Sequence, residues 1–333
     1  MTERAQPPAR VPDVAVHAGW LAARLLFLAG LFTYLFVGQE PEKTRFWDTF
    51  FNTGHAPLFG LAALVIRSLL ASEAHLAGVW RTSAVAFGVA LAAGAATELI
   101  QVFLPSRDAS LIDLARDAAG AGAFLMLWSL YLAWRRPGTA PTTAAGRAGI
   151  AAVAVLALLA AGGHLLFTTA AYAGRNRAFP LLFPADGAWW QEPFVSTRGA
   201  SLSPAPAFSG HGDGPWVRLD LRPGRYSGLE LVEPFPDWRN RTRLVFAIVS
   251  EMKAPLNLEL RVHDRDHNRR FADRFNRTLT IVPGENRIIV NLDDVRQSPG
   301  RRQMDLARIR SVMLFVTRLA GPARVYVGPM RLE

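Results

Sequence analysis

Five apolar runs, all before residue 175, constrain this chain more than any other feature of its sequence. A helix needs about 20 residues to cross the hydrocarbon layer of a bilayer, which is about 30 Å thick. The runs cover residues 16–37, 55–71, 82–104, 111–134 and 148–172. They predict about five transmembrane helices. The first run contains Arg24 and lacks a small-residue cleavage site, so we expect a retained helix and not a removed signal peptide.

The positions of the basic residues predict the orientation of these helices, because basic residues in short loops favour the cytoplasm. With a cytoplasmic N-terminus, seven basic side chains lie on the cytoplasmic side: Arg4, Arg10, Arg67, Arg81, Arg135, Arg136 and Arg147. Four lie on the opposite side: Lys43, Arg45, Arg107 and Arg116. Five crossings then place everything after residue 175 outside the cytoplasm.

The region after residue 175 has the pattern of an all-β domain. Apolar or alternating runs recur at 216–221, 227–233, 243–250, 256–264, 278–282, 287–292, 311–317 and 323–327. Turn signals such as Pro, Gly and Asn in 283–286 separate these runs, so we expect a β-sandwich or jelly roll. Only residues 304–309 have the pattern of a helical turn.

The sequence therefore predicts a multi-domain protein, an α-helical transmembrane bundle followed by an all-β jelly-roll or sandwich domain. The predicted parts are a disordered N-terminus at 1–14, a four-helix transmembrane domain at 15–135, a cytoplasmic linker at 136–147, a fifth transmembrane helix at 148–172 and an extracytoplasmic β-sandwich at 175–333.

The formal net charge of +10 lies almost entirely in the predicted outer domain. Before residue 175 the chain has 12 basic and 10 acidic residues, and from residue 175 onward it has 25 basic and 17 acidic residues. A basic exterior favours anionic partners such as lipid headgroups or acidic glycans. The alternative is a general preference for arginine, since only 2 of the 37 basic residues are lysine. We expect no nucleic-acid partner, because the basic part lies outside the cell.

A polar segment, Thr97 to Asp117, joins the third and fourth apolar runs. Charges at the rim of a hydrocarbon layer are costly and usually face a bundle interior or a watery cavity, so they mark a candidate functional site. Glu98 lies about 9 Å below the predicted helix end. The candidate ligand-binding residues are Glu98, Gln101, Arg107, Asp113, Arg116 and Asp117, with His55 at the start of the second run. The alternative is an ion-pair lock that holds the helix ends together.

Local patterns explain part of this segment without a ligand. Ser110 and Asp113 have the spacing of a capping box, in which the serine oxygen and the carboxylate accept reciprocal backbone N–H groups. Gly94 and Gly120 lie near Glu98 and Asp117, and small residues let helices approach closely. We therefore expect the carboxylates of the two helices to face each other or a shared cation.

These residues resemble the VanZ-like family of bacterial membrane proteins, named for a member linked to glycopeptide resistance. The resemblance covers about residues 20–134 and rests on His55, the Glu98-x-x-Gln101 pair, Arg107, Ser110, Asp113 and Gly120. This chain departs from the family at Phe51-Asn52, where Asp-Lys is frequent, and at Asp117, where Asn is frequent. The resemblance implies a multi-pass protein of the bacterial plasma (inner) membrane.

The outer region resembles the galactose-binding-like jelly rolls of carbohydrate-binding modules, through the hairpin 261–276 and the closing strand 325–332. This resemblance implies a glycan partner. Exposed aromatic rings could stack on sugars, and the candidates in predicted loops are Trp189, Trp190, Tyr226 and Trp238. The alternative for each ring is packing in the core or at an interface.

The hairpin also contains Asp264, Asp266 and Asn268, which match the opening of a calcium loop. Arg269 replaces the turn glycine and Phe275 the bidentate glutamate, so the pattern favours a hairpin turn with Asx hydrogen bonds. Calcium elsewhere on the jelly roll stays open. We expect no other metal and no cofactor, and the absence of cysteine excludes disulfides and thiolate-bound metals.

The function that these patterns favour is a noncatalytic envelope protein. We expect it to bind a lipid or a lipid-linked glycan headgroup at the polar site and a glycan at the β-domain. The alternative is a membrane enzyme that acts on a lipid-linked phosphate or glycan, with Glu98 or His55 as general base. No nucleophile–base pair or metal-ligand spacing supports the enzyme. A transporter would need a continuous relay or an inverted repeat, which the sequence lacks.

Overall fold

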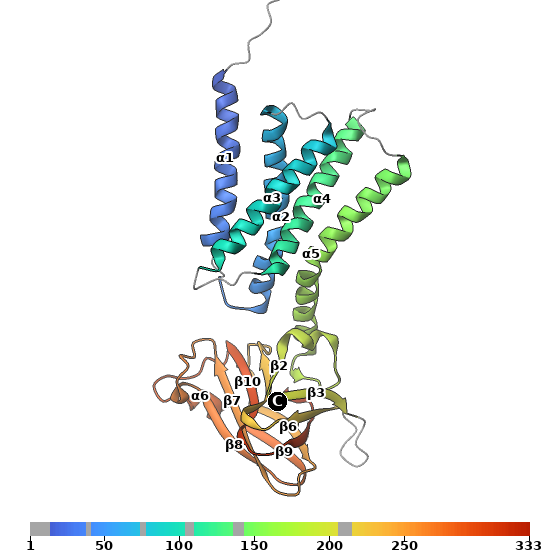
Figure 1. Ribbon diagram of the computed structural model, residues 1–333. Coiled ribbons are helices and arrows are strands. Elements are labelled where there is room, and N and C mark those ends of the chain that lie inside the picture. The colour runs from blue at the N-terminus through green and yellow to red at the C-terminus, as the bar shows by residue number, and fades with distance from the viewer. Residues whose placement is uncertain (1–13, 38–40, 74–77, 104–109, 136–142, 206–214) are drawn as a thin grey trace, which may run out of the picture. The chain divides into compact units, whose positions relative to one another are not determined.

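The computed structural model describes residues 14–333 except 38–40, 74–77, 104–109, 136–142 and 206–214. The chain divides into two compact units, 1–166 and 167–333. The first is helical and the second is mainly β-sheet (Figure 1). This agrees with the predicted order of a helical region followed by an all-β domain. Part of the predicted linker and almost all of the predicted N-terminal tail lie outside the described residues.

Five long helices coincide with the five apolar runs. They are α1 Val14–Val37, α2 Arg45–Glu73, α3 Val79–Gln101, α4 Leu111–Arg135 and α5 Ala144–Ala178. Two starts differ from the prediction. α2 begins at Arg45, so His55 lies within the helix and does not open it. α5 begins at Ala144, inside the predicted linker, and its last residues belong to the second unit.

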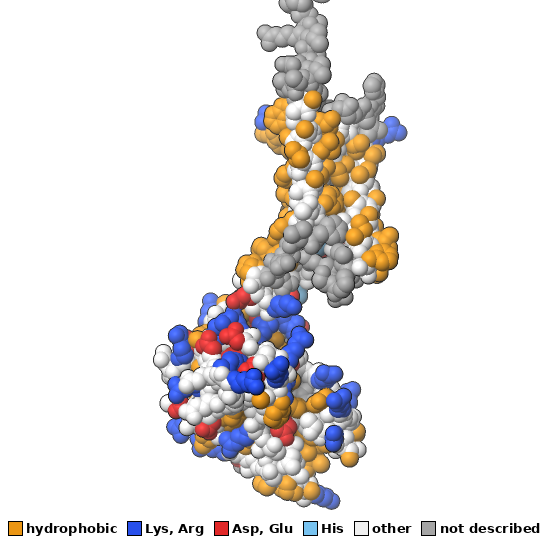
Figure 2. Space-filling model, turned by 90° about the vertical axis from the view of Figure 1, so that its left-hand side faces the viewer, with side chains coloured by type: hydrophobic (Ala, Val, Ile, Leu, Met, Phe, Trp, Pro, Cys, Tyr) orange, Lys and Arg blue, Asp and Glu red, His pale blue; other side chains and the backbone are white. Residues whose placement is uncertain are grey.

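Among the described residues, three helical segments are long and apolar enough to cross a membrane: Arg45–Ala71, Val79–Gln101 and Ala144–Ala178. α1 contributes a shorter apolar segment, Ala18–Tyr34. The predicted number of five spans therefore stays a prediction. Large apolar side chains such as Leu26 (73% exposed) and Trp134 (76% exposed) lie on the outside of the helical unit. The face drawn in Figure 2 is mostly hydrophobic over these helices.

Small residues set the packing of the helical unit. A Cβ at Gly120 would lie 1.9 Å from the carbonyl oxygen of Ala56, so α2 and α4 touch at the backbone. Gly60 leaves room in the same way for the ring of Phe124. Such contacts are typical of helices that pack inside a membrane. They hold the middle of α4 directly against the middle of α2.

The second unit is a sandwich of two antiparallel sheets. One sheet has the order β1-β12-β6-β11-β4-β3, with β9 also paired to β6, and the other has the order β2-β5-β10-β7-β8. The strands are β1 Leu181–Phe183, β2 Val195–Arg198, β3 Ala200–Ala205, β4 Trp216–Leu221, β5 Gly224–Val232, β6 Arg243–Ser250, β7 Leu256–Asp264, β8 Phe275–Ile281, β9 Gly284–Asn291, β10 Ile309–Leu319, β11 Ala323–Val327 and β12 Met330–Leu332. Alternate residues of both sheets meet in one core, for example Leu219, Ile248, Leu260 and Leu314.

Each of the eight predicted runs has a strand as its counterpart, which confirms the sandwich. The short strands β1, β2 and β3 were not predicted. The predicted helical turn at 304–309 is wrong: these residues form a turn and the beginning of β10. The sandwich does contain a short α-helix just before these residues, α6 Leu292–Gln297. The side chain of Asn291 caps it by accepting a hydrogen bond from the N–H of Asp293. Asn is a favoured N-cap residue for this reason.

Candidate functional site

Three helices of the first unit bring three ionisable side chains together. His55 of α2, Glu98 of α3 and Asp117 of α4 each place one potential ligand atom within 4.8 Å of the other two. His55 Nδ1 lies 2.9 Å from Asp117 Oδ1. Asp117 is 1% exposed and Glu98 is 8% exposed. We call these three residues the triad.

Glycine positions explain how the triad forms. The backbone contact between Gly120 and Ala56 brings His55 and Asp117 to the same level of α2 and α4. On α3, a Cβ at Gly94 would lie 2.9 Å from Asp117 Oδ2, so the absence of a side chain there makes room for the carboxylate. Gly94 is one turn before Glu98, which therefore faces the same space.

Glu98 also positions the start of α4. Its Oε2 accepts from the backbone N–H of Ser110 at 2.6 Å. Ser110 Oγ in turn accepts from the N–H of Asp113 at 3.3 Å, as the capping box predicts. The second half of the prediction is wrong, because the Asp113 carboxylate pairs with Arg116 on its own helix. The reciprocal carboxylate is Glu98, from the preceding helix.

Two oxygens of the triad are buried without a hydrogen bond. Glu98 Oε1 and Asp117 Oδ2 have no partner among the residues that the structure describes. A buried carboxylate oxygen that has lost water and gained no donor costs kilocalories. The arrangement therefore has capacity for a cation or a hydrogen-bond donor.

The remaining predicted residues of this site take different positions. Gln101, one turn after Glu98, is buried at 5% exposure. Asp113 and Arg116 form a pair within α4, with side chains 15% and 16% exposed, so they do not lock two helices together. Arg107 lies outside the described residues. The structure thus brings together His55, Glu98 and Asp117, with the Asp113–Arg116 pair on the same helix as Asp117.

The four candidate aromatic residues of the β-domain also separate. Trp238 is fully buried and its Nε1 donates to the carbonyl of Phe235, so its assignment as a glycan-stacking ring is wrong. Trp190 packs against Gly174. Trp189 is 56% exposed and its ring lies 5.8 Å from that of Phe167. Tyr226 is 41% exposed and lies on β5, not in a loop.

Tyr226 belongs to the outward face of the five-stranded sheet. Burial alternates along these strands, so the side chains between the core residues point away from the sandwich. We call this surface the outer sheet face; the pairing of β5, β10 and β7 places on it Tyr226, Glu230, Met313, Phe315, Glu259, Arg261 and His263. The Tyr226 and Phe315 ring centroids are 6.1 Å apart. A guanidinium, that of Arg198, lies 6.0 Å from the Tyr226 ring.

The β7–β8 loop folds over one end of the outer sheet face. Arg261 Nη2 donates to His267 Nε2 at 3.2 Å, so His267 Nδ1 carries the proton that it donates to the Asp273 carbonyl at 2.9 Å. The His267 ring lies 4.7 Å from that of His263. Burial, with help from Arg261, lowers the pKa of His263 to about 3. His263 is thus neutral at pH 7.

Two polar atoms on this face are buried and unsatisfied. Arg261 Nε and His263 Nδ1 have no hydrogen-bond partner within the described part of the chain. Arg261 Nε is always a hydrogen-bond donor, because the guanidinium group stays protonated. The other is a nitrogen of a neutral imidazole. Together with the exposed Tyr226 ring they supply both apolar and polar contact groups.

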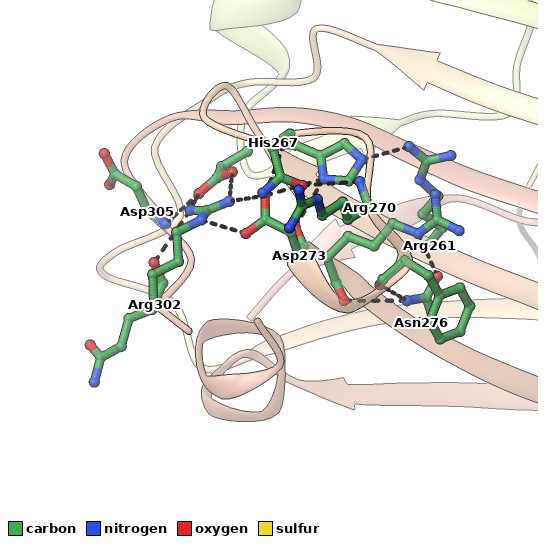
Figure 3. Close-up of polar contacts among 12 residues, drawn as sticks. Arg261, His267, Arg270, Asp273, Asn276, Arg302 and Asp305 are labelled. Atoms are coloured by element: carbon green, nitrogen blue, oxygen red, sulfur yellow. Dashed lines mark hydrogen bonds and ion pairs between the residues drawn. The ribbon is translucent and has the colours of Figure 1, made fainter. Parts of the chain in front are cut away.

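The β7–β8 loop itself is held by a guanidinium (Figure 3). Arg302 binds Asp264 through both terminal nitrogens, at 2.5 and 2.7 Å, and Asp273 through Nε at 2.7 Å. The Arg302 bonds lower the pKa of Asp273 to about 2. Asn268 Oδ1 accepts from the N–H of Arg270, which is the predicted Asx turn. Arg302 therefore supplies the positive charge that calcium would bring to Asp264.

Sequence reasoning missed Arg261, His263 and Phe315 as site residues. The signal was present in β7, where Asn257, Glu259, Arg261 and His263 alternate with Leu258, Leu260 and Val262. An alternation with only polar residues on the outer face indicates a solvated or ligand-facing surface, but it does not distinguish the two.

The fold and these sites define a protein with a helical unit around a buried polar triad and a β-sandwich unit with one aromatic and polar sheet face. No family model matches the chain, so the resemblance to the VanZ-like family stays a hypothesis. No curated protein matches it either. Solved structures also match, and the three described next cover 42–46% of the chain.

Three of these structures illustrate the similarity. One is an exo-beta-agarase with 20% sequence identity. The match covers 42% of this chain and 22% of the agarase chain, and the TM-score is 0.34. The second is the family 11 carbohydrate-binding module of a cellulosomal cellulase of Clostridium thermocellum, with 15% sequence identity. The match covers 46% of this chain and 92% of that chain, and the TM-score is 0.35. The third is a family 30 carbohydrate-binding module of a cellulosomal cellulase of the same organism. Its sequence identity is 14%, the match covers 42% of this chain and 85% of that chain, and the TM-score is 0.31. The chain spans about a fifth of the length of the agarase.

Proposed function

We propose that this protein is a membrane-anchored glycan-binding protein whose β-sandwich binds an oligosaccharide on the outer sheet face. The observation that carries the proposal is the combination of an exposed Tyr226 ring, the adjacent Phe315 ring and two buried unsatisfied polar atoms on β7. Ligand sites commonly join aromatic surface to a few placed polar groups.

The chemistry of a sugar matches this combination. A pyranose has apolar C–H faces and a rim of hydroxyl groups. The Tyr226 ring offers a flat apolar surface with a polar end. Arg261 Nε and His263 Nδ1 are closed to solvent in the unbound protein, so neighbouring side chains must move before either atom meets a sugar hydroxyl. Nε then donates, and the neutral imidazole accepts or donates. Glu230 on β5 and Glu259 on β7 lie near these groups on the same face, and their carboxylates can accept hydrogen bonds from further hydroxyl groups.

The proposal places the helical unit in the plasma membrane of a bacterium, with the N-terminus in the cytoplasm and the sandwich outside. Its support is the length and apolar surface of the helices and the excess of arginine at the predicted cytoplasmic ends. The surface of the sandwich drawn in Figure 2 carries many Lys and Arg side chains, which favours anionic envelope glycans over neutral ones.

Glycan binding is tested with tag-free full-length protein in detergent, applied to an array of neutral β-glucan and anionic bacterial oligosaccharides. Titration calorimetry then gives the affinity for the best glycan. We expect Tyr226→Ala and Arg261→Ala each to weaken binding by about tenfold, which corresponds to about 1.4 kcal/mol. Trp189→Ala is the matched control, because Trp189 is an exposed ring on a different element. Equal affinities for all three variants, or no glycan bound by wild type, would contradict the proposal.

A second candidate function is the binding of a lipid or lipid-linked glycan headgroup at the triad. The specific observation in its favour is the pair of unsatisfied buried oxygens, Glu98 Oε1 and Asp117 Oδ2, on helices with apolar outer surfaces. Mass spectrometry of lipids that co-purify with wild type and with Glu98→Gln tests it. An unchanged lipid profile would exclude this candidate, whereas turnover of a lipid-linked phosphate that disappears in Glu98→Gln would favour an enzyme.

A further inference from the structure

The triad brings together donor types that suit a metal ion. One imidazole nitrogen and two carboxylates meet on three separate helices, and the donors of His55 and Asp117 are 62 residues apart in the sequence. Sequence spacing therefore suggests a shared cation only for the carboxylates and does not indicate a site of these three residues. The helix packing creates it.

The distances fit a small divalent ion. Such an ion holds nitrogen and oxygen donors at about 2.0–2.2 Å, which puts two donors of a tetrahedral site about 3.4 Å apart. The His55 Nδ1 and Asp117 Oδ1 atoms are 2.9 Å apart, and all three ligand atoms lie within 4.8 Å. To bring the two most distant ligand atoms to the separation of a tetrahedral site, one of them must move by on the order of 1 Å. Rotation of a carboxylate side chain supplies such a movement.

The charge balance favours a cation. Glu98 and Asp117 bring two carboxylates into a space that is at least nine-tenths closed to solvent. Among the described residues, the charged groups that face them are His55 on α2 and the Asp113–Arg116 pair on α4, and Arg116 is already bound to Asp113. One imidazole cannot offset two buried carboxylates even when it is protonated. Within the described part of the chain, Glu98 Oε1 and Asp117 Oδ2 have no hydrogen-bond donor, so a cation would find two unused acceptors here.

We propose that His55, Glu98 and Asp117 bind one divalent transition-metal ion, Zn²⁺ or Mn²⁺, within the helical unit. The donor set of one imidazole and two carboxylates suits these ions, whereas calcium takes six to eight oxygen ligands. The ion joins α2, α3 and α4 and keeps at least one coordination position for water or an anionic ligand group. This inference goes beyond glycan binding and does not require a lipid, because it concerns the ion alone.

The test uses tag-free full-length protein in detergent after removal of metal with a chelator. Equilibrium dialysis against Zn²⁺ or Mn²⁺ alone, with elemental analysis of the bound metal, is expected to give one ion per chain. Glu98→Gln and Asp117→Asn are expected to lower the affinity by about tenfold or more. Asp113→Asn is the matched control, because Asp113 is a carboxylate on the same helix that pairs with Arg116 outside the triad.

A spectroscopic readout covers the case of variants that do not fold. Mn²⁺ bound to wild-type protein is expected to show nitrogen hyperfine coupling from the His55 imidazole, which His55→Ala removes. Wild type without stoichiometric metal, or with bound Mn²⁺ that lacks nitrogen coupling, would overturn the proposal and leave a histidine–aspartate pair. Equal affinity in Glu98→Gln, Asp117→Asn and Asp113→Asn would also overturn it. Each of these results is independent of whether the sandwich binds a glycan.

Discussion

Gly120 of α4 lies directly against the carbonyl group of Ala56 of α2, with no space for a side chain between them. The obstruction is backbone, which cannot rotate away as a side chain can. We therefore expect Gly120→Ala to separate α2 from α4 and to destabilise the helical unit by about 1–3 kcal/mol, the usual cost of overpacking. A lower thermal midpoint of the full-length protein in detergent measures this effect.

Gly122→Ala is the control for this prediction. A Cβ at Gly122 would lie 3.5 Å from the Phe87 ring, an ordinary van der Waals contact. Alanine is the better helix former, so this variant should be neutral or more stable by up to about 1 kcal/mol. A Gly120→Ala protein as stable as Gly122→Ala would show that α2 and α4 are not in backbone contact.

The Arg302 guanidinium is the sole positive charge described in contact with the buried Asp264 side chain. Arg302→Ala should therefore destabilise the sandwich by about 3–5 kcal/mol, because it leaves a buried carboxylate without its partner. Hydrogen exchange of β7 and β10 measures the loss within the sandwich itself. Arg239→Ala removes an exposed arginine from Asp237, and it should change stability by at most about 0.5 kcal/mol. Equal exchange rates in the two variants would contradict the role of Arg302.

Acid should destabilise the sandwich through His263. Burial lowers the pKa of His263 in the folded protein to about 3, below the ordinary value of 6.5. Between these two pH values the unfolded chain binds more protons than the folded chain, so stability rises with pH across this window. The expected loss between pH 7 and pH 3 is on the order of 2–4 kcal/mol. Hydrogen exchange of the β7 amides, measured across this pH window, reports this loss of stability.

His263→Gln provides the comparison, because glutamine keeps a polar side chain that does not titrate. The variant should have a shallower pH dependence than wild type between pH 6.5 and 3. Below about pH 4 both proteins should lose stability further, since the Arg302 bonds lower the pKa of Asp273 to about 2. Identical pH profiles above pH 4 would show that His263 is not responsible.

The sequence was sufficient to predict the elements whose hydrophobic pattern is long. β4, β6, β7 and β11 have the predicted bounds, because two-residue alternation or, in β6, a continuous apolar run is visible over five residues or more. The missed strands β1 and β2 have only three and four residues, so they show no clear period. The start of α2 was missed for another reason. Residues 45–54 mix polar and aromatic side chains, so their helix lies outside the apolar run.

The sites were less predictable because they depend on contacts between distant segments. Burial at the rim of a span indicated Glu98 and Asp117, but not that His55 contacts Asp117. Trp238 and Tyr226 were equivalent in sequence, and only the folded sandwich buries one ring and exposes the other. Glu98 takes the place of Asp113 in one half of the predicted capping box, because the Asp113 carboxylate pairs with Arg116. Tertiary contacts therefore decided both the cap and the triad.

Gly94 offers a way to disturb the triad without removing a donor atom. A Cβ at this position of α3 would lie 2.9 Å from Asp117 Oδ2, which is the end of a side chain that can move aside. The fold should therefore tolerate Gly94→Ala, while the Asp117 carboxylate shifts within the triad. We expect the affinity for Zn²⁺ or Mn²⁺ to fall by about tenfold, the effect expected when a ligand is misplaced.

Gly88→Ala is the matched control, since it is on the same helix and a Cβ there meets nothing within 4 Å. Both substitutions replace glycine by the better helix former, so any difference in metal affinity comes from the contact with Asp117. Equilibrium dialysis of the two variants, with thermal midpoints measured on the same samples, separates binding from stability. Gly94→Ala protein that is folded and binds metal as tightly as Gly88→Ala would mean that Asp117 is not a ligand.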